Sequence, residues 1–238
     1  MVIYFQLNEI KKMKNKLFIV STPIGNYDDI TLRAIEVLRS VDFIICEEYK
    51  IARRLLSHYK IEKELIALNE HNENDVVNEI LLEIAKGKTS ALISDHGTPL
   101  FSDPGHLLVD VCISQKIEII PVPGANSLLP ALTGSGFDFE KFYYYGWLSP
   151  KKDIRRKQLL DLKRIKEVIV LMDTPYRLKT LLTDVVKIFG KNIQVSLAYQ
   201  LTMKNEKYCR GTASSVLKIA EEKNLKGEFV LILNNKRL

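Results

Sequence analysis

Short runs of β-branched and other apolar residues alternate with amphipathic segments along the chain, and this alternation restricts the fold more than any other feature. Strands that alternate with helices are typical of a parallel α/β sheet. Five such runs are the expected strands of a first domain: Leu17–Val20, Phe43–Cys46, Leu65–Leu68, Ala91–Ile93 and Ile117–Val122. Pro121, Pro123 and Gly124 then interrupt the pattern.

A second α/β pattern follows this interruption. Its expected strands are Phe142–Trp147, Val168–Met172, Val195–Leu201 and Phe229–Leu233, with helices near residues 154–165, 176–189 and 214–223. The predicted fold class is therefore α/β with two domains, residues 1–124 around a parallel sheet and the basic residues 125–238. Residues 1–15 are predicted to be a disordered or mis-assigned start.

The composition restricts the class of protein. Of the 238 residues, 46% are hydrophobic and 27% are charged, as in soluble globular proteins. No apolar run approaches the roughly 20 residues that span a bilayer, so no membrane segment is expected. The three cysteines lie far apart in the sequence, which favours a reduced cytoplasm without a disulfide framework or a zinc motif.

Charge is divided unevenly along the chain. Residues 1–124 contain 14 Lys and Arg against 18 Asp and Glu, a net charge of −4, whereas residues 125–238 contain 21 against 11, a net charge of +10. A basic half of this kind is expected to face an anion.

Eight of these cations lie in residues 151–166, directly after the aromatic segment 142–147. Cations beside aromatic rings are typical of single-stranded RNA binding. We interpret the aromatic residues as strand core, with contacts to RNA bases as the alternative. We interpret the cations as RNA contacts, with a solvated helix face as the alternative. The predicted RNA contacts are Lys151, Lys152, Arg155, Arg156, Lys157 and Arg177.

Three loops rich in Gly and Pro follow the first, fourth and fifth expected strands. They are residues 22–26, 95–99 and 123–127. Ligands of open α/β sheets bind beyond the carboxyl ends of strands, so these loops predict a ligand cleft. No G-x-G-x-x-G sequence follows the first strand, which argues against a dinucleotide site. The loops suit a ligand held mainly by backbone groups and shape.

Several motifs resemble the ribosomal RNA branch of the tetrapyrrole methylase family, in order and at matching spacing from Lys16 to Leu233. They are Thr22–Asn26 with Asp29–Ala34, His71–Glu73, Ser94–Pro99, Ser102–Gly105, Gly146–Leu148, Thr174–Leu178, Arg210–Thr212 and Lys226–Glu228. The resemblance implies two α/β domains with a cofactor cleft between them, a homodimer, and S-adenosylmethionine as methyl donor. It implies methylation of a cytidine 2′-hydroxyl in small-subunit (16S) ribosomal RNA or the 30S particle.

The resemblance also implies the cofactor-binding positions. These are Pro23, Gly25, Asp95, His96, Gly97, Thr98, Phe101, Asn126, Ser127, Asp173 and Gln200. A ribose hydroxyl must lose a proton during methylation, so a carboxylate within reach can act as base. Glu48, Asp103 and Glu206 are the candidate catalytic residues, with hydrogen bonding to loop backbone as the alternative role. No metal site is predicted.

The chain departs from the family pattern at a few positions. Tyr49 stands where a threonine is usual, His96 where an alanine is usual, and Tyr199-Gln200 where an Arg-Glu pair is usual. The short helical C-terminal extension is expected to be missing. Two alternatives therefore stay open: a methylase of a tetrapyrrole or another small acidic metabolite, and a non-catalytic RNA-binding paralogue.

Overall fold

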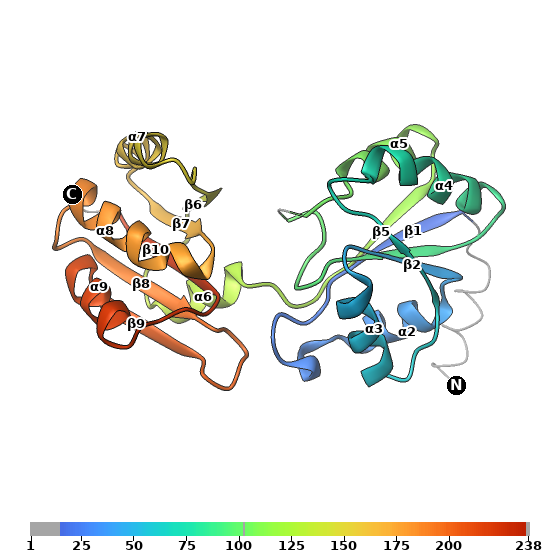
Figure 1. Cartoon of the computed structure of the whole chain (residues 1–238), viewed down its shortest axis with the longest axis horizontal. Coiled ribbons are helices and arrows are strands. Elements are labelled where there is room, and N and C mark those ends of the chain that lie inside the picture. Colours follow the sequence, from blue (N-terminus) through green and yellow to red (C-terminus); the bar gives the residue numbers. More distant parts are fainter. Residues whose placement is uncertain (1–14, 102, 237–238) are drawn as a thin grey trace. The chain divides into compact units, whose positions relative to one another are not determined.

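The computed structural model describes residues 15–101 and 103–236, so the predicted disordered or mis-assigned start lies outside the described residues except for Asn15. The chain divides into two compact units, one ending at Asn126 and one beginning at Ser127. Figure 1 shows a sheet and its covering helices in each unit.

The first unit contains, in the described chain, a five-stranded parallel sheet with the order β3-β2-β4-β1-β5. The strands are β1 (Lys16–Val20), β2 (Phe43–Cys46), β3 (Glu64–Ala67), β4 (Ser90–Ile93) and β5 (Glu118–Val122). Helices α2 (Leu32–Ser40) and α3 (Tyr49–His58) pack on one face, and α4 (Glu73–Ala85) and α5 (His106–Ser114) on the other. A 3₁₀ turn, η1 (Tyr27–Asp29), precedes α2.

Burial on both faces explains the apolar strand sequences. Along β1, Phe18 and Val20 pack with α2 and α3, while Leu17 and Ile19 pack with α4 and α5. A strand that is covered on both faces needs apolar side chains at consecutive positions. The chain leaves β1 along one face of the sheet and leaves the neighbouring β4 along the other, which is the switch point where ligands bind in such sheets.

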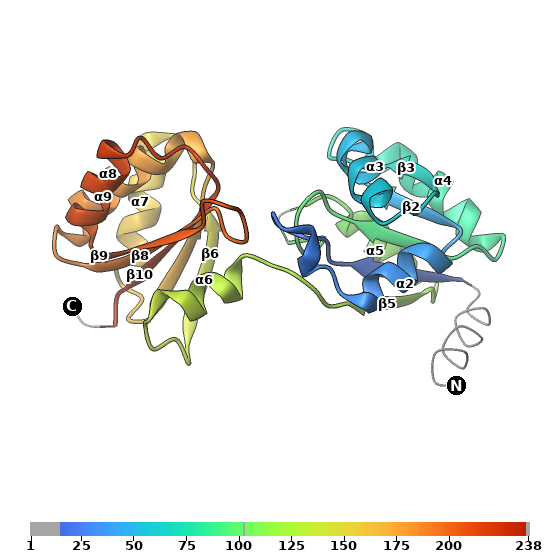
Figure 2. The ribbon, with the colours of Figure 1, turned by 90° about the horizontal axis from the view of Figure 1, so that it is seen from below.

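The second unit has a mixed sheet with the order β6-β7-β10-β8-β9. Its strands are β6 (Phe142–Trp147), β7 (Val168–Met172), β8 (Gln194–Tyr199), β9 (Lys207–Thr212) and β10 (Phe229–Asn234). β6 and β7 are parallel, and the other paired strands are antiparallel. Helices α7 (Lys152–Leu162), α8 (Leu178–Phe189) and α9 (Ala213–Glu222) cover one face of this sheet. A 3₁₀ turn, η2 (Pro175–Arg177), leads into α8. Helix α6 (Leu128–Ser135) lies on the opposite face (Figure 2).

The α/β class is confirmed, and two elements were not predicted. Strand β9 has only one buried residue, Cys209, so it lacks the apolar run that marks the other strands. Helix α6 follows the loop 123–127 directly and is too short for a clear helical period. Both depend on tertiary contacts that local sequence does not display.

Strand β9 holds α6 in place. The Tyr208 hydroxyl donates to the carbonyl of Pro130 at 2.8 Å, and Arg210 Nε donates to the carbonyl of Gly134 at 2.9 Å. The Tyr208 ring lies so close to α6 that a Cβ added at Gly134 would be 2.1 Å from its Cζ. Position 134 therefore has no room for a side chain.

We expect Gly134→Ala to destabilise the protein because the added methyl group must displace the Tyr208 ring, at a cost of about 1–3 kcal/mol. Thermal or urea unfolding measures this change. Thr133→Ala, one residue earlier on the exposed side of α6, is the control and should shift stability by about 0.5 kcal/mol or less. Equal stabilities of the two variants would contradict the packing of Tyr208 on Gly134.

Candidate functional site

The three loops rich in Gly and Pro meet at the carboxyl edge of the first sheet. Thr22 and Gly97 exchange backbone hydrogen bonds of 2.8 and 3.1 Å. The Ser21 and Thr98 hydroxyls lie 3.1 Å apart, and the Thr98 hydroxyl donates to the carbonyl of Ala125 at 3.4 Å. Loops that follow β1, β4 and β5 are therefore joined to one another by hydrogen bonds.

Gly97 is required by this geometry. Its φ is +85°, and a Cβ there would lie 3.2 Å from the Ile24 side chain. The predicted cofactor residues of the first unit lie on these loops or directly after them. They are Pro23 and Gly25 after β1, Asp95, His96, Gly97, Thr98 and Phe101 after β4, and Asn126 after β5.

Carboxylates gather at the same edge. The Glu48 backbone N–H donates to Asp95 Oδ1 at 3.3 Å. Burial, with the nearby Asp95 charge, raises the pKa of Asp103 to about 6. Burial also raises the pKa of Glu47, again with help from Asp95 and Asp103. A carboxylate with a pKa near 6 accepts a proton close to neutral pH, which suits a general base.

Glu47 is a residue that the sequence analysis did not select. It lines a small cavity together with Asp103, Ser94 and several apolar residues: Leu68, Leu92, Ile93, Pro99 and Pro104. Its position directly after β2 is the signal that could have identified it, because carboxyl ends of parallel strands share one edge.

Asp173 stands at the carboxyl end of β7 in the second unit and is only 2% exposed. Its Oδ1 accepts hydrogen bonds from the Thr174 backbone N–H and from Arg177. Its Oδ2 is buried and has no hydrogen-bond partner among the described residues. A buried acceptor without a partner is costly, so this oxygen fits a ligand that offers a hydrogen-bond donor.

Gln200 follows β8 at the same edge of the second sheet as Asp173. Its φ is +48°, a left-handed conformation that costs a non-glycine residue energy. Its backbone N–H donates to the carbonyl of Glu228 at 2.8 Å, and its side chain lies over Gly227, where a Cβ would be 2.6 Å away.

Two more predicted site residues have local structural roles. Glu206 accepts from the Thr202 backbone N–H, which gives Glu206 a role in closing the turn. Ser127 is the N-cap residue of α6.

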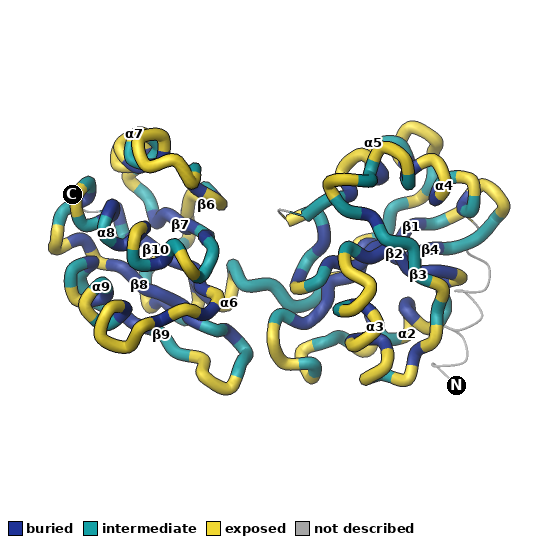
Figure 3. The backbone as a smooth tube through the Cα atoms, viewed as in Figure 1, coloured by how far each residue is buried: buried dark blue, intermediate teal, exposed yellow. Residues whose placement is uncertain are grey.

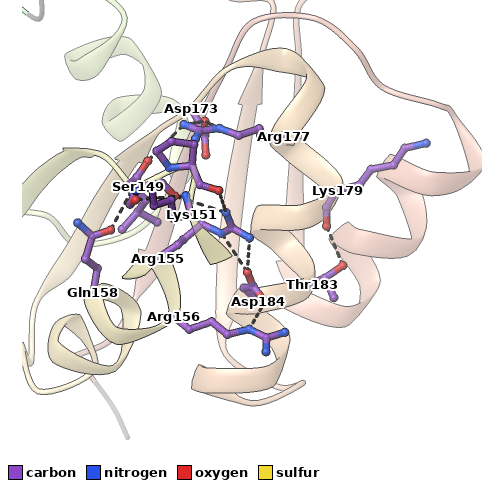
Figure 4. Close-up of polar contacts among 12 residues, drawn as sticks. Ser149, Lys151, Arg155, Arg156, Gln158, Asp173, Arg177, Lys179, Thr183 and Asp184 are labelled. Atoms are coloured by element: carbon purple, nitrogen blue, oxygen red, sulfur yellow. Dashed lines mark hydrogen bonds and ion pairs between the residues drawn. The ribbon is translucent and has the colours of Figure 1, made fainter. Parts of the chain in front are cut away.

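The basic segment is divided between surface and interior. Lys151, Lys152 and Lys157 are exposed. The predicted RNA contact is wrong for Arg155, which is 4% exposed and pairs with Asp184 at 2.8 Å. Figure 4 shows Arg156 pairing with the other oxygen of Asp184, also at 2.8 Å.

Arg177 also donates inward, to Asp173 and to the carbonyl of Leu148. Figure 3 shows that the backbone of β7 and β8 in this unit is mostly coloured as buried.

The aromatic segment is divided in the same way. Tyr145 packs against the core, whereas Phe142, Tyr143 and Trp147 are exposed. A bulge in β6 before Gly146, whose φ is +78°, changes the pairing register with β7. The interpretation as strand core therefore fails for the three exposed rings.

Two other kinds of feature are absent from the described residues. No group of three His, Cys, Asp or Glu side chains in residues 15–101 and 103–236 is arranged to hold a metal ion. Within the same residues, no helix is both long and apolar enough to cross a membrane.

Comparison with known proteins gives consistent results. Residues 16–217 match the family model for Tetrapyrrole (Corrin/Porphyrin) Methylases. The Ribosomal RNA small subunit methyltransferase I of Halalkalibacterium halodurans is 39% identical over 220 residues, which cover 92% of this chain and 76% of that protein. The protein of the same name from Thermotoga maritima is 40% identical over 221 residues, covering 93% of this chain and 99% of the relative.

Solved structures share the fold. A cobalt precorrin-4 methyltransferase superposes with a TM-score of 0.71 at 17% identity, covering 92% of this chain and 94% of that one. A diphthine synthase gives a TM-score of 0.68 at 16% identity, with coverages of 91% and 88%.

Asp103→Asn is expected to change stability in a pH-dependent way. The Asp103 pKa rises from 3.8 to about 6 on folding, so the folded protein holds this proton more tightly than the unfolded chain. Ionisation of Asp103 therefore destabilises the fold increasingly as pH rises through this range. The Tm of the variant should equal that of the wild type near pH 3.8 and should exceed it above about pH 6. Asp110→Asn, exposed on α5, is the control; a Tm difference independent of pH would contradict the burial of Asp103.

Proposed function

We propose a methyltransferase function, because the chain belongs to the tetrapyrrole methylase family and to its ribosomal RNA small subunit methyltransferase I group. In this proposal the protein transfers a methyl group from S-adenosylmethionine to the 2′-hydroxyl of a cytidine in small-subunit (16S) ribosomal RNA. The observation that carries this proposal is the identity of 39–40% to such relatives across more than nine-tenths of the chain. The exposed lysines of residues 151–157 support an RNA substrate.

The residues present fit the methyl donor. Asp173 Oδ2, which is buried without a partner among the described residues, is available to a hydroxyl or amino donor of the ligand, and Gly97 lets a ligand approach the backbone closely. The residues proposed to hold the donor are Pro23, Gly25, Asp95, His96, Gly97, Thr98, Phe101, Asn126, Ser127, Asp173 and Gln200. S-adenosylmethionine, when bound, supplies a methyl group on a sulfonium centre.

Asp103 is the base that we favour for the ribose hydroxyl. Its raised pKa and its place beside the Asp95 loop support this role. Glu48 remains a second candidate at the same edge. Glu206 is the weakest of the three, because one of its carboxylate oxygens already accepts from the Thr202 backbone.

The direct test is methyl transfer by the purified protein. With labelled S-adenosylmethionine, 16S ribosomal RNA or assembled 30S particles should become labelled, and nuclease digestion should give 2′-O-methylcytidine. Transfer to an anionic tetrapyrrole instead would establish the small-metabolite alternative. Cofactor binding without transfer to any of these substrates would contradict the proposal and favour a non-catalytic RNA-binding protein.

The homodimer and the cytoplasmic location stay predictions. Ultracentrifugation of the same preparation tests the homodimer.

Asp103→Asn should lower kcat by about 10²–10⁴, the usual contribution of a general base, with the affinity for S-adenosylmethionine retained. The wild-type kcat should fall as pH drops below about 6, where Asp103 becomes protonated. Steady-state kinetics on 30S particles measures both effects. Asp110→Asn serves as the matched control, and a kcat of Asp103→Asn within about threefold of the wild type would exclude Asp103 as the base.

A further inference from the structure

The segment 148–151, which joins β6 to α7, is held by side chains along its backbone. Arg177 donates to the carbonyl of Leu148 at 3.3 Å, and the Ser149 backbone N–H donates to Gln158 Oε1 at 2.9 Å. Arg155 Nη1 donates to the carbonyls of Pro150 and Ser149 at 3.0 and 3.4 Å. Figure 4 shows these contacts around the segment. Its path is therefore fixed by α7 and by the turn that precedes α8.

The ion pair of Arg155 with Asp184 anchors this arrangement. Both residues are buried, 4% and 2% exposed. Arg155 Nε and Nη2 donate to Asp184 Oδ2 at 3.0 and 2.8 Å, which joins α7 to α8. Apolar side chains of similar volume can replace a buried ion pair with little loss of stability. An apolar side chain at position 155 cannot donate to the two carbonyls, so the specific contribution of Arg155 is to the path of the segment.

The fixed segment carries exposed groups at both ends. Trp147 precedes it and is 45% exposed, and Lys151 ends it as the N-cap residue of α7. The Lys151 backbone N–H is held by the Ser149 hydroxyl at 3.2 Å, while its side chain is exposed and forms no ion pair within the described residues. A lysine on a fixed backbone loses less conformational freedom on binding than one on a mobile loop.

We propose that Arg155 is a positioning residue for RNA binding. Through Asp184 and the carbonyls of Ser149 and Pro150, it holds Lys151 where the ammonium group contacts a phosphate of the RNA. This inference rests on the proposed function, and it replaces the direct RNA contact predicted for Arg155 with an indirect role.

A double-mutant cycle on the full-length protein tests the inference. The first change is Lys151→Ala, which removes the phosphate contact. The second is the pair Arg155→Met and Asp184→Leu, which preserves side-chain volume and removes the Arg155 hydrogen bonds to the carbonyls of Ser149 and Pro150. Arg164→Met is the matched control, because Arg164 is an exposed residue that follows the same helix. Affinity for 30S particles is measured over a series of salt concentrations, and thermal unfolding verifies that each variant folds.

In the wild-type background, Lys151→Ala should weaken binding about fivefold at 0.1 M salt and lower the slope of log K against log salt by about 0.7, the value for one phosphate contact on a single strand. In the Met/Leu background, Lys151→Ala should change the affinity by less than about twofold. The Met/Leu variant should raise KM for 30S particles while kcat and KM for S-adenosylmethionine stay unchanged. Arg164→Met should leave the full effect of Lys151→Ala intact.

An equal effect of Lys151→Ala in both backgrounds would overturn the inference and leave the proposed function standing. Wild-type protein that shows neither salt-dependent affinity for 30S particles nor methyl transfer would overturn both. If the Met/Leu pair fails to fold, Arg155→Lys takes its place, because lysine keeps the charge beside Asp184 but lacks the planar fork that reaches two carbonyls as well. The same coupling with Lys151 is then expected.

Discussion

The burial of the first sheet on both faces is the constraint on which the rest of that unit depends. With helices on each side, the strands have no room for polar side chains along their length, so polar and conformationally special residues are confined to the strand ends. Parallel pairing brings all the carboxyl ends to one edge. The Thr22 and Gly97 backbones then join the loops at the centre of that edge, and the carboxylates of Glu47, Asp95 and Asp103 are gathered beside them.

Burial of the strands also explains which parts of the fold can be predicted from the sequence. Buried strands such as Phe43–Cys46 are continuous apolar runs, and the loops after β1, β4 and β5 carry Gly and Pro, which suit a backbone that turns sharply. Glu47 was missed because a second carboxylate, Glu48, follows it directly, and the local sequence does not show which of the two lines the cavity with Asp103. Strand β9 was missed because it has a single buried residue, Cys209, and because Tyr208 packs on α6, where its hydrogen-bond partner Pro130 lies 78 residues earlier in the sequence.

Charge shows the limit of sequence reasoning most clearly. Residues 151–166 form one basic run in the sequence, yet adjacent members of that run have different surroundings. Lys151 and Lys152 are exposed, whereas Arg155 is buried against Asp184. Asp184 lies almost 30 residues further along, on α8, so no local pattern reveals the pairing. A cation count therefore describes the field around a domain better than it identifies individual contacts with a ligand.

The position of β10 has a consequence for how the chain folds during synthesis. The first sheet is built from consecutive strands, and all of them precede residue 123. The second sheet has its final strand, Phe229–Asn234, between β7 and β8, where it pairs with both. On a ribosome that makes the chain from its N-terminus, the first unit can close while translation continues. The second unit has a gap at its centre until β10 has emerged, and its apolar strands need protection from association for all of that time.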